Sequence, residues 1–477
     1  MSSAAFHNND DDSVIDRAGM VLAHNPIGLL LPGIDQTTHR QAVRLCARDY
    51  LENHVFFNDK QFHNHLNHHL LAAFSMGASA ARLQEIFDIN STYQRPSLAL
   101  TSDITITADN FVDYLAKEEY YPNFVAFYRR ELAESNSATW NDVVSKYFFH
   151  PQLFPLAMSG LLHPFIQLGY GLEFKSEAIV ACALAQASVH KKQFTSALDS
   201  NVFDEICRGT AETNEASLSL LDILDRMRND AITSAISYSD DPYTDENRAH
   251  GQALAIKYAK LWSVQHSESA VSEKCLEATQ VVALVYGSLT RPGYRRPALE
   301  FGIMHNLTAS YFLPIVLDVL SLDNKARLLH AYAVTFLYMF AMKGCPPLYI
   351  QSELTSTNTH CTPQSHESMA SDGNPWLDVF AKAVANNDMH VPKAVRALWR
   401  LSLLTAFPAQ QAKPAADGYE LPPPVNCLHL ARITVDAFSK SSRRDSGIDR
   451  QQIASLNEGQ SWAHGMLAFD EFWTHYV

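Results

Sequence analysis

The sequence predicts an all-α protein, folded as a large single-domain helical bundle. Three observations support this prediction. Glycine accounts for 18 of the 477 residues, about 4% against a usual ~7%, so residues that interrupt helices are scarce. Apolar residues recur at helical spacing in one segment after another. Strand-like alternation of apolar and polar residues is rare, and its clearest case, residues 100–109, is short.

The expected helices can be followed along the chain from their apolar spacing and their end signals. The first covers residues 37–54 and has a threonine as its N-cap. Residues 107–135 are expected to form two helices, because Pro122 interrupts the pattern between them. Further helices are expected at 176–190, 217–230, 250–267 and 324–344. Loops are expected at 239–247, 354–375 and 406–425.

Composition limits the partners and the location of the protein. The formal charge is −14, so the surface repels polyphosphate and nucleic acid is not an expected partner. No stretch approaches the ~18 uninterrupted apolar residues of a membrane span, so no membrane partner is expected. Seven cysteines without a C-x-x-C pair are typical of a reducing compartment. Because the N-terminus lacks a secretory signal, we expect a cytoplasmic protein with a disordered acidic tail at residues 1–20 and a helical domain at 21–477.

Residues 62–69 read FHNHLNHH, so four of the eight are histidines. On a continuous helix His65 and His69 project about 40° apart, at the edge of the apolar face. His68 would point away from that face into solvent. Two imidazoles at i and i+4 can share one metal ion. A polar, hydrogen-bonded helix without metal explains the same spacing, and this segment alone leaves both interpretations open.

Three further histidines favour a metal site. His163 and His305 each stand within an apolar run, and His390 begins a helix three residues before Lys393. A single histidine of this kind is more often a hydrogen-bonded core residue than a ligand. Several of them in one helical chain favour a shared site between facing helices.

The segments that contain these histidines resemble signature segments of the questin oxidase-like family, in the same order and over residues 40–400. The resemblance implies oxidative cleavage of a polycyclic aromatic quinone in fungal secondary metabolism. The family often has a second histidine after its His-Pro pair. Gln167 stands at that position here, so it is not expected to be an essential ligand. The segments are FFNDKQFHNHLNHHLLAAFSMGAS (56–79), HPFIQLGYGLEF (163–174), ALAQASVH (183–190), RPGYRRPALEFGIMHNLTAS (291–310) and MHVPKAVRAL (389–398).

The resemblance leaves two kinds of oxygen chemistry open. Members of the family are often labelled NADPH-requiring Baeyer–Villiger oxidases, whereas some relatives resemble non-heme iron dioxygenases. A flavin enzyme needs a G-x-G-x-x-G turn between a strand and a helix, and this chain has none. We therefore expect Fe(II) held by histidines, because iron gives O₂ a one-electron route into closed-shell organic molecules. NADPH stays open as a co-substrate.

The ligand set follows from the histidine segments. Glu173 is the nearest motif carboxylate, and Lys393 is the alternative source of negative charge. A carboxylated Lys393 would bind like a carboxylate, whereas an ammonium beside Fe(II) would be repelled. A surface cation is the other interpretation of Lys393. His390 is the reserve ligand, and Lys393 and His390 are the predicted catalytic residues. The predicted metal ligands are His65, His69, His163, His305 and Lys393.

The predicted substrate is a flat, hydroxylated polycyclic aromatic molecule that reacts with O₂. Aromatic side chains near the histidines are expected to line its pocket. Three functions stay open: an iron-dependent dioxygenase that cleaves a ring carbon–carbon bond of an anthraquinone-type polyketide, an NADPH-dependent Baeyer–Villiger oxidase, and a non-catalytic helical scaffold protein. The oligomeric state stays open. The predicted substrate-binding residues are Phe62, Phe165, Tyr170 and Phe174.

Overall fold

The all-α prediction is confirmed by the computed structural model, in which almost all regular structure is helical. It describes residues 13–135, 139–191, 196–209, 217–294, 296–355, 373–406, 423–438 and 462–475. Within these ranges the only strands are β1 (Leu299–Glu300) and β2 (Trp462–Ala463), which form a parallel pair. One contiguous hydrophobic core runs through the helices.

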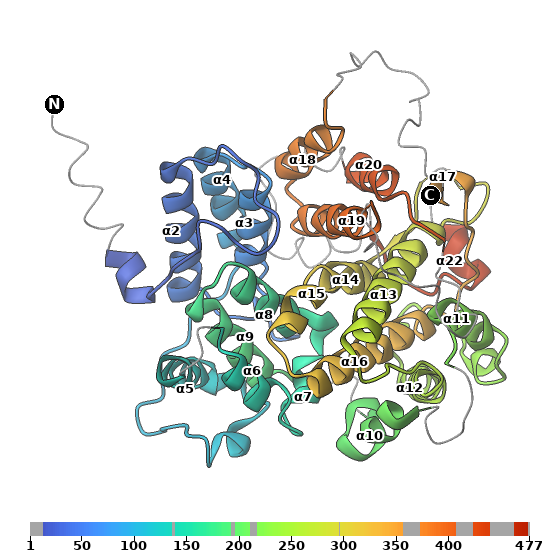
Figure 1. Ribbon diagram of the computed structural model, residues 1–477, viewed down its shortest axis with the longest axis horizontal. Helices are drawn as coiled ribbons and strands as arrows, with labels where there is room; N and C mark the ends of the chain where they lie inside the picture. The colour runs from blue at the N-terminus through green and yellow to red at the C-terminus, as the bar shows by residue number, and fades with distance from the viewer. Residues whose placement is uncertain are drawn as a thin grey trace.

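The N-terminal half of the chain packs as two neighbouring groups of helices (Figure 1). In the first group, α2, α3 and α4 all contact one another. In the second, α9 packs against both α5 and α8. The bounds are α2 (Gln36–Glu52), α3 (Leu66–Ser75), α4 (Ala80–Ser91), η1 (Phe111–Tyr114), η2 (Glu118–Tyr120), α5 (Tyr121–Glu134), α6 (Asn141–Phe148), α7 (Phe154–Ala157), η3 (Gly160–Leu162), α8 (His163–Glu173), α9 (Glu177–Val189) and η4 (Ser196–Leu198).

The C-terminal half is built around the long helices α13 and α16, which contact each other and α14. Helix α19 packs against α18 and α20. The bounds are α10 (Ser200–Arg208), α11 (Leu220–Arg228), η6 (Thr233–Ala235), α12 (Asp245–Ala259), α13 (Glu268–Ser288), α14 (Phe301–Ser310), α15 (Leu313–Asp318), α16 (Leu322–Ala341), α17 (Ser352–Thr355), α18 (Trp376–Ala385), α19 (His390–Ala406), α20 (Cys427–Phe438) and α22 (Asp470–His475).

Four helices from distant parts of the chain form a closed ring of contacts in the middle of the molecule. Helix α3 contacts α8, α8 contacts α14, α14 contacts α19, and α19 contacts α3 again. All ten residues of α3 are buried, so this helix has no solvent face at all. The ring joins the two halves of the molecule (Figure 1), and it carries the histidine segments.

Several of the expected elements differ in detail from the observed ones. The first helix is present as α2, but Asp35 caps it by accepting a hydrogen bond from the Thr38 amide. Pro122 lies in the first turn of α5, where its missing N–H costs nothing. Residues 100–109, which have the clearest strand-like alternation in the sequence, form turns and irregular backbone. A two-sided strand needs a partner edge to satisfy its backbone, and none lies beside this segment among the described residues.

Part of the segment expected to be an N-terminal tail lies within the described ranges. Residues 1–12 lie outside the described ranges, but residues 13–18 are helical and Ala18 and Met20 are buried. The chain continues along α8, where the Ala23 amide donates to the Phe174 carbonyl. The loop expected at 239–247 ends where α12 begins at Asp245. The other two expected loops fall mainly on 356–372 and 407–422, outside the described ranges.

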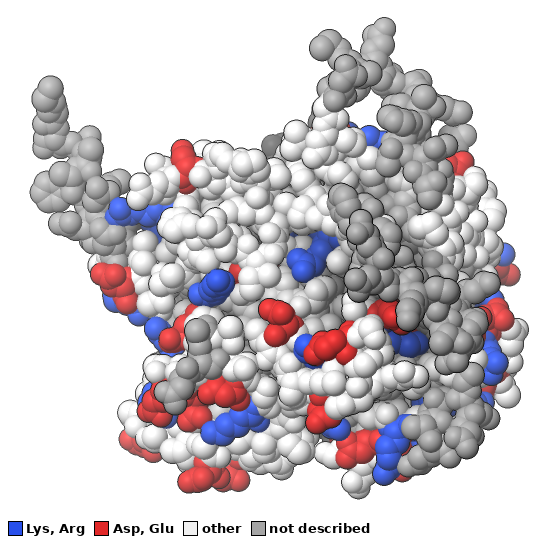
Figure 2. Space-filling view, in the orientation of Figure 1, with Lys and Arg blue, Asp and Glu red and all other residues white. Residues whose placement is uncertain are grey.

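Acidic and basic side chains are interspersed over the face shown in Figure 2, without a continuous basic area among the residues coloured there. None of the described helices combines the length and the apolar character that crossing a bilayer requires.

Candidate metal centre

Three histidines from distant parts of the chain meet inside the ring of helices. Each of His65, His163 and His305 offers a ring nitrogen, and these three atoms all lie within 4.8 Å of one another. All three side chains are buried. Among the residues that the structure describes, no carboxylate joins this group. Three converging imidazoles of this kind can hold a transition metal such as iron, copper or zinc.

The local backbone conformation sets the direction of each of these histidine side chains. His65 is the N-cap of α3, with φ −102° and ψ 1°. Its backbone is therefore not helical, and its side chain does not follow the helical spacing of α3. His163 opens α8, and the two residues before it, Leu161 and Leu162, have φ of 53° and 64°. A leucine in this left-handed region costs of order 1–3 kcal/mol. His305 lies in the second turn of α14. The strained turn before His163 sets the position from which α8 starts.

Backbone carbonyls accept hydrogen bonds from the Nδ1 atoms of His163 and His305, which leaves a lone pair on Nε2 of each ring. His163 Nδ1 donates to the Gly160 carbonyl, and His305 Nδ1 donates to the Phe301 carbonyl over 2.7 Å. A neutral imidazole with a proton on Nδ1 presents a lone pair on Nε2. The Nε2 atom of His305 is buried and has no hydrogen-bond partner. Metal-bound histidines in proteins usually have this second hydrogen bond.

His390 and Lys393 stand beside the three histidines, on the first turn of α19. The ring centre of His390 is 4.9 Å from that of His65 and 5.2 Å from that of His305. Its Nδ1 donates to Asp388 Oδ1 over 3.0 Å, and its Nε2 is buried without a partner. Lys393 Nζ is also buried without a partner. Asp388 was not predicted as a site residue. Its position two residues before His390, at the N-terminus of the helix, was a usable signal for such a role.

Burial keeps the four histidines uncharged at neutral pH. Desolvation lowers the pKa of His65, His163 and His305 well below the ordinary histidine value, and Lys393 and neighbouring histidines lower it further. It lowers the pKa of His390 to about 4. Desolvation also lowers the pKa of Lys393 to about 7, against the opposing effect of Asp388. The cluster therefore offers neutral nitrogen donors, as metal binding requires.

The other histidines of the 62–69 segment lie around the centre rather than in solvent. The expectation that His68 is solvated is wrong, because it is fully buried and bonds Gln167 Oε1 through Nε2 over 2.5 Å. His63 stacks on His163 with ring centres 4.2 Å apart. Its Nε2 lies 3.1 Å from that of His190, a contact that the sequence did not reveal.

The structure places His69 apart from the three converging nitrogens. Its Nδ1 lies 3.5 Å from the amide nitrogen of Asn90 on α4. The predicted i, i+4 pairing assumed one helix through both residues, but α3 begins at Leu66. His65 and His69 consequently project to different neighbours.

Glu173 is the motif carboxylate nearest to the histidines in sequence, but it belongs to another cluster. Its Oε1 accepts hydrogen bonds from Arg396 Nη2 over 2.5 Å and from the Tyr311 hydroxyl over 2.6 Å. Ten residues separate it from His163 along α8, which is about 15 Å of helix. The carboxylate therefore compensates the buried Arg396 charge instead of reaching the histidines.

The four predicted substrate-binding aromatics lie in different surroundings. Phe62 is 41% exposed, whereas Phe165, Tyr170 and Phe174 are fully buried. Phe165 contacts Phe148, and Phe174 contacts Phe74. Tyr170 comes nearest to the centre, because its ring stacks on His68 with ring centres 5.1 Å apart.

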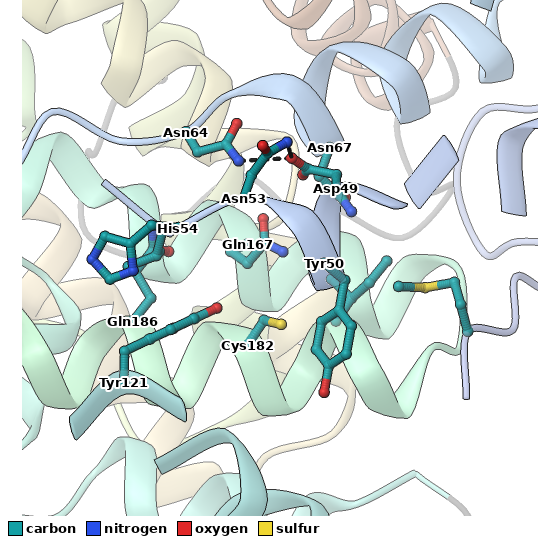
Figure 3. Close-up of a pocket in the computed structure, with 13 residues that line it drawn as sticks. Asp49, Tyr50, Asn53, His54, Asn64, Asn67, Tyr121, Gln167, Cys182 and Gln186 are labelled. Atoms are coloured by element: carbon teal, nitrogen blue, oxygen red, sulfur yellow. Dashed lines mark hydrogen bonds between the residues drawn. The ribbon is translucent and has the colours of Figure 1, made fainter. Parts of the chain in front are cut away.

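Figure 3 shows a small pocket that is lined largely by polar side chains. Asp49 forms one side and accepts hydrogen bonds from the amide groups of Asn53 and Asn64. Two of the lining residues, Gln167 and Gln186, also contact the histidine cluster, through His68 and His63 respectively. The space measures about 40 Å³, enough for a few water molecules but not for a polycyclic quinone. The lining residues are Met20, Asp49, Tyr50, Asn53, His54, Val55, Asn64, Asn67, Tyr121, Gln167, Ile179, Cys182 and Gln186.

The residues present fit a metal ion. The buried Nε2 atoms of His305 and His390 have no hydrogen-bond partner, and neither does that of His69. The Nε2 atoms of His65 and His163 lie 2.6 Å apart. A buried polar group without a hydrogen-bond partner destabilises the folded protein. A ligand shared by several of these nitrogens would remove that cost. The donor set is nitrogen-rich, which suits iron, copper or zinc better than calcium or magnesium.

Comparisons with known proteins agree with the importance of these segments. The sequence model of the questin oxidase-like family matches residues 62–398, which includes His65, His163, His305, His390 and Lys393. The chain is 29% identical to the Baeyer-Villiger oxidase ptaJ of Pestalotiopsis fici over 369 residues, which covers 75% of this chain and 79% of the relative.

Two further relatives cover more of the chain. The Oxidoreductase AflY of Aspergillus parasiticus is 27% identical over 427 residues, 86% of this chain and 81% of the relative. The Questin oxidase of Aspergillus terreus is 25% identical over 473 residues, 96% of both chains. The similarity to this last protein extends over nearly the whole fold.

Proposed function

The chain belongs to the questin oxidase-like family, and we propose that it is a non-heme iron-dependent oxygenase. Its proposed reaction is the cleavage of a ring carbon–carbon bond in an anthraquinone-type polyketide of fungal secondary metabolism. The names of its relatives support an oxidoreductase. The observation that carries the iron proposal is the convergence of His65, His163 and His305 within 4.8 Å.

The proposed ligand set differs from the set expected from spacing alone. His65, His163 and His305 would hold the ion, and His390 replaces His69, because its free Nε2 borders the group. Lys393, as a carbamate, would add the anionic ligand that this carboxylate-free cluster otherwise lacks. When bound, Fe(II) would supply the one-electron chemistry that ground-state O₂ needs to react with a closed-shell aromatic.

The protein residues around the centre have roles that do not depend on the ion. Gly160, Phe301 and Asp388 hold three imidazoles in the tautomer that frees Nε2. The buried setting of Lys393 lowers its pKa to about 7, which favours the neutral amine that reacts with CO₂. Apolar burial keeps bulk water away from the cluster.

An NADPH-dependent Baeyer–Villiger oxidase is the second candidate, because several relatives carry that name. A dinucleotide bound in the usual way lies across a parallel sheet with a glycine-rich turn. In the described residues the sheet consists of two strands of two residues each, which cannot form such a site. The iron proposal is therefore preferred, and NADPH is retained as a co-substrate to be tested.

Metal analysis of the purified protein is the first test. We expect about one iron per chain after anaerobic reconstitution with Fe(II), and no turnover after chelation. A reaction under ¹⁸O₂ then separates the candidates. Two labelled oxygen atoms in the product, measured by mass spectrometry, are expected of the dioxygenase. One labelled atom together with stoichiometric NADPH consumption would favour the Baeyer–Villiger candidate.

A further inference from the structure

The segment from residue 462 to 475 lies beyond residue 398, where the match to the family model ends. It nevertheless reaches the histidine cluster. We infer that Trp462 is a positioning residue for the metal centre, which acts through Asp388 on His390. This inference rests on the proposed metal centre and extends it to a part of the chain outside the family match.

The contacts form a direct chain of hydrogen bonds. Trp462 Nε1 donates to Asp388 Oδ2 over 2.9 Å. The other oxygen of the same carboxylate, Oδ1, accepts from the backbone amide of His390 over 2.8 Å and from its Nδ1 over 3.0 Å. The indole therefore fixes the rotation of the carboxylate, and the carboxylate fixes both the tautomer and the orientation of the imidazole.

The indole is also packed against its targets. Trp462 is 9% exposed, and its ring stands edge to face on His390 with ring centres 6.0 Å apart. Asp388 keeps about a quarter of its side chain exposed. A carboxylate in such a position can rotate toward water unless a second donor holds it. Trp462 supplies that donor, so its loss would loosen His390 without removing any ligand.

The same segment holds the helix that carries His305. Strand β2 begins at Trp462 and pairs in parallel with Leu299–Glu300, directly before α14. Glu300 caps α14 by accepting from the Ile303 amide, and it forms a buried ion pair with Lys343 over 2.7 Å. The Lys343 carbonyl in turn accepts a hydrogen bond from the Ala468 amide. The segment thus joins α14 and α19, which carry three of the proposed ligands.

The chain offers a matched control in the same segment. Trp473 is 3% exposed, and its Nε1 donates to the Leu467 carbonyl over 2.9 Å. Replacing either tryptophan by phenylalanine removes a buried indole hydrogen bond of the same length, but only Trp462→Phe removes a bond to Asp388. A purely structural role predicts equal effects on metal binding.

The experiment uses the full chain loaded with Co(II), whose visible spectrum reports ligand geometry, and measures metal release to a chelator. Groups that orient metal ligands typically change metal affinity by about 10–100-fold, so Asp388→Asn should release Co(II) at least about tenfold faster. Trp462→Phe should follow in the same direction and alter the cobalt spectrum. Trp473→Phe should match the wild type in both measurements.

The outcomes separate the inference from the proposed function. Equal release from the two tryptophan variants, or an unchanged cobalt spectrum in Trp462→Phe, would overturn the inference alone. A wild-type protein that retains neither Co(II) nor Fe(II) would overturn the metal centre and the inference with it. If Trp462→Phe does not fold, Asp388→Asn and Asp388→Glu give the test, with partial recovery expected for the restored carboxylate and its absence counting against the inference.

Discussion

The Nε2 atoms of His65 and His163 lie 2.6 Å apart, although the two residues are 98 positions apart in the sequence. His163 donates its Nδ1 proton to the Gly160 carbonyl, so its neutral form has only a lone pair at Nε2. His65 can satisfy that lone pair with one proton, but the Nε2 atoms of His305 and His390 remain unpaired. The proposed metal ion would satisfy these groups together, which a single proton cannot.

Replacing a converging histidine should remove the metal and leave the fold. We expect His163→Ala and His305→Ala to retain less than about a tenth of the wild-type iron, since ligand losses exceed the 10–100-fold effect of supporting residues. His69→Ala is the matched control, because His69 is also a buried histidine but faces Asn90. Iron content is measured by elemental analysis and folding by circular dichroism. Full iron in both ligand variants, or iron loss in His69→Ala, would contradict the proposed ligand set.

Lys393 should act through a carbamate rather than through its charge. Lys393→Ala and Lys393→Arg should both lose activity, because arginine keeps the charge but cannot be carboxylated. A short carboxylic acid should partly restore Lys393→Ala and not Lys393→Arg. Protein equilibrated with ¹³C-bicarbonate should show a carbamate signal by NMR that Lys393→Arg lacks. A fully active Lys393→Arg protein would refute this role.

Gly160 should tolerate no side chain, because its Cβ would lie 2.3 Å from His190 Nε2 and 2.5 Å from His63 Nε2. Gly160→Ala should displace the turn that positions His163 and destabilise the protein by more than the ~1 kcal/mol that alanine costs at positive φ. Gly33→Ala is the control, since Gly33 also has positive φ but open space around it. Urea unfolding and iron content are measured for both. Equal losses of stability and of iron in Gly160→Ala and Gly33→Ala would show that crowding at Gly160 has no effect.

Removing only one partner of the buried Arg396–Glu173 pair should strongly lower the free energy of unfolding. Arg396→Met leaves the fully buried Glu173 uncompensated and should cost about 3–5 kcal/mol, whereas the double variant Arg396→Met/Glu173→Leu should recover much of this loss. The exposed pair between Arg48 and Glu52 serves as the control, and Arg48→Met should cost less than about 1 kcal/mol. The free energies of unfolding are measured with denaturant. A double variant no more stable than Arg396→Met alone would argue against this account.

His330 should contribute to acid sensitivity outside the metal centre. Burial, with Lys274 and Arg327 nearby, lowers its pKa from 6.5 to about 4. Between these values the unfolded chain binds a proton that the folded protein does not, so stability falls as the pH drops from about 6.5 to about 4.

The His330→Leu variant tests the predicted fall in stability at acidic pH. It should flatten the dependence of unfolding free energy on pH in that window by up to about 1.4 kcal/mol per pH unit. Unfolding is measured in chelator at several pH values, so that metal release does not contribute. An unchanged slope would mean that His330 does not titrate differently in the two states.

Much of the fold could be predicted because helix formation depends on local patterns. The apolar spacing and end signals of α2 and α16 are visible in short windows of sequence, and Pro122 was correctly placed at a helix boundary. The strand-like alternation at 100–109 shows the limit of such patterns, since a strand exists only where another edge pairs with it. The strand pair seen in the described residues joins residues 299–300 to 462–463, a contact that no local pattern specifies.

The sequence by itself determined which residues are candidates for the chemistry. His65, His163, His305, His390 and Lys393 stood out by residue type and by segment. Only the tertiary structure decided that His390 and not His69 borders the group, that His68 is buried, and that Asp388 and Trp462 support His390. The physical reason is that a helical wheel describes one helix against one layer, whereas α3 is enclosed on all sides. Which nitrogen faces which neighbour therefore depends on four helices that meet only when the whole chain has folded.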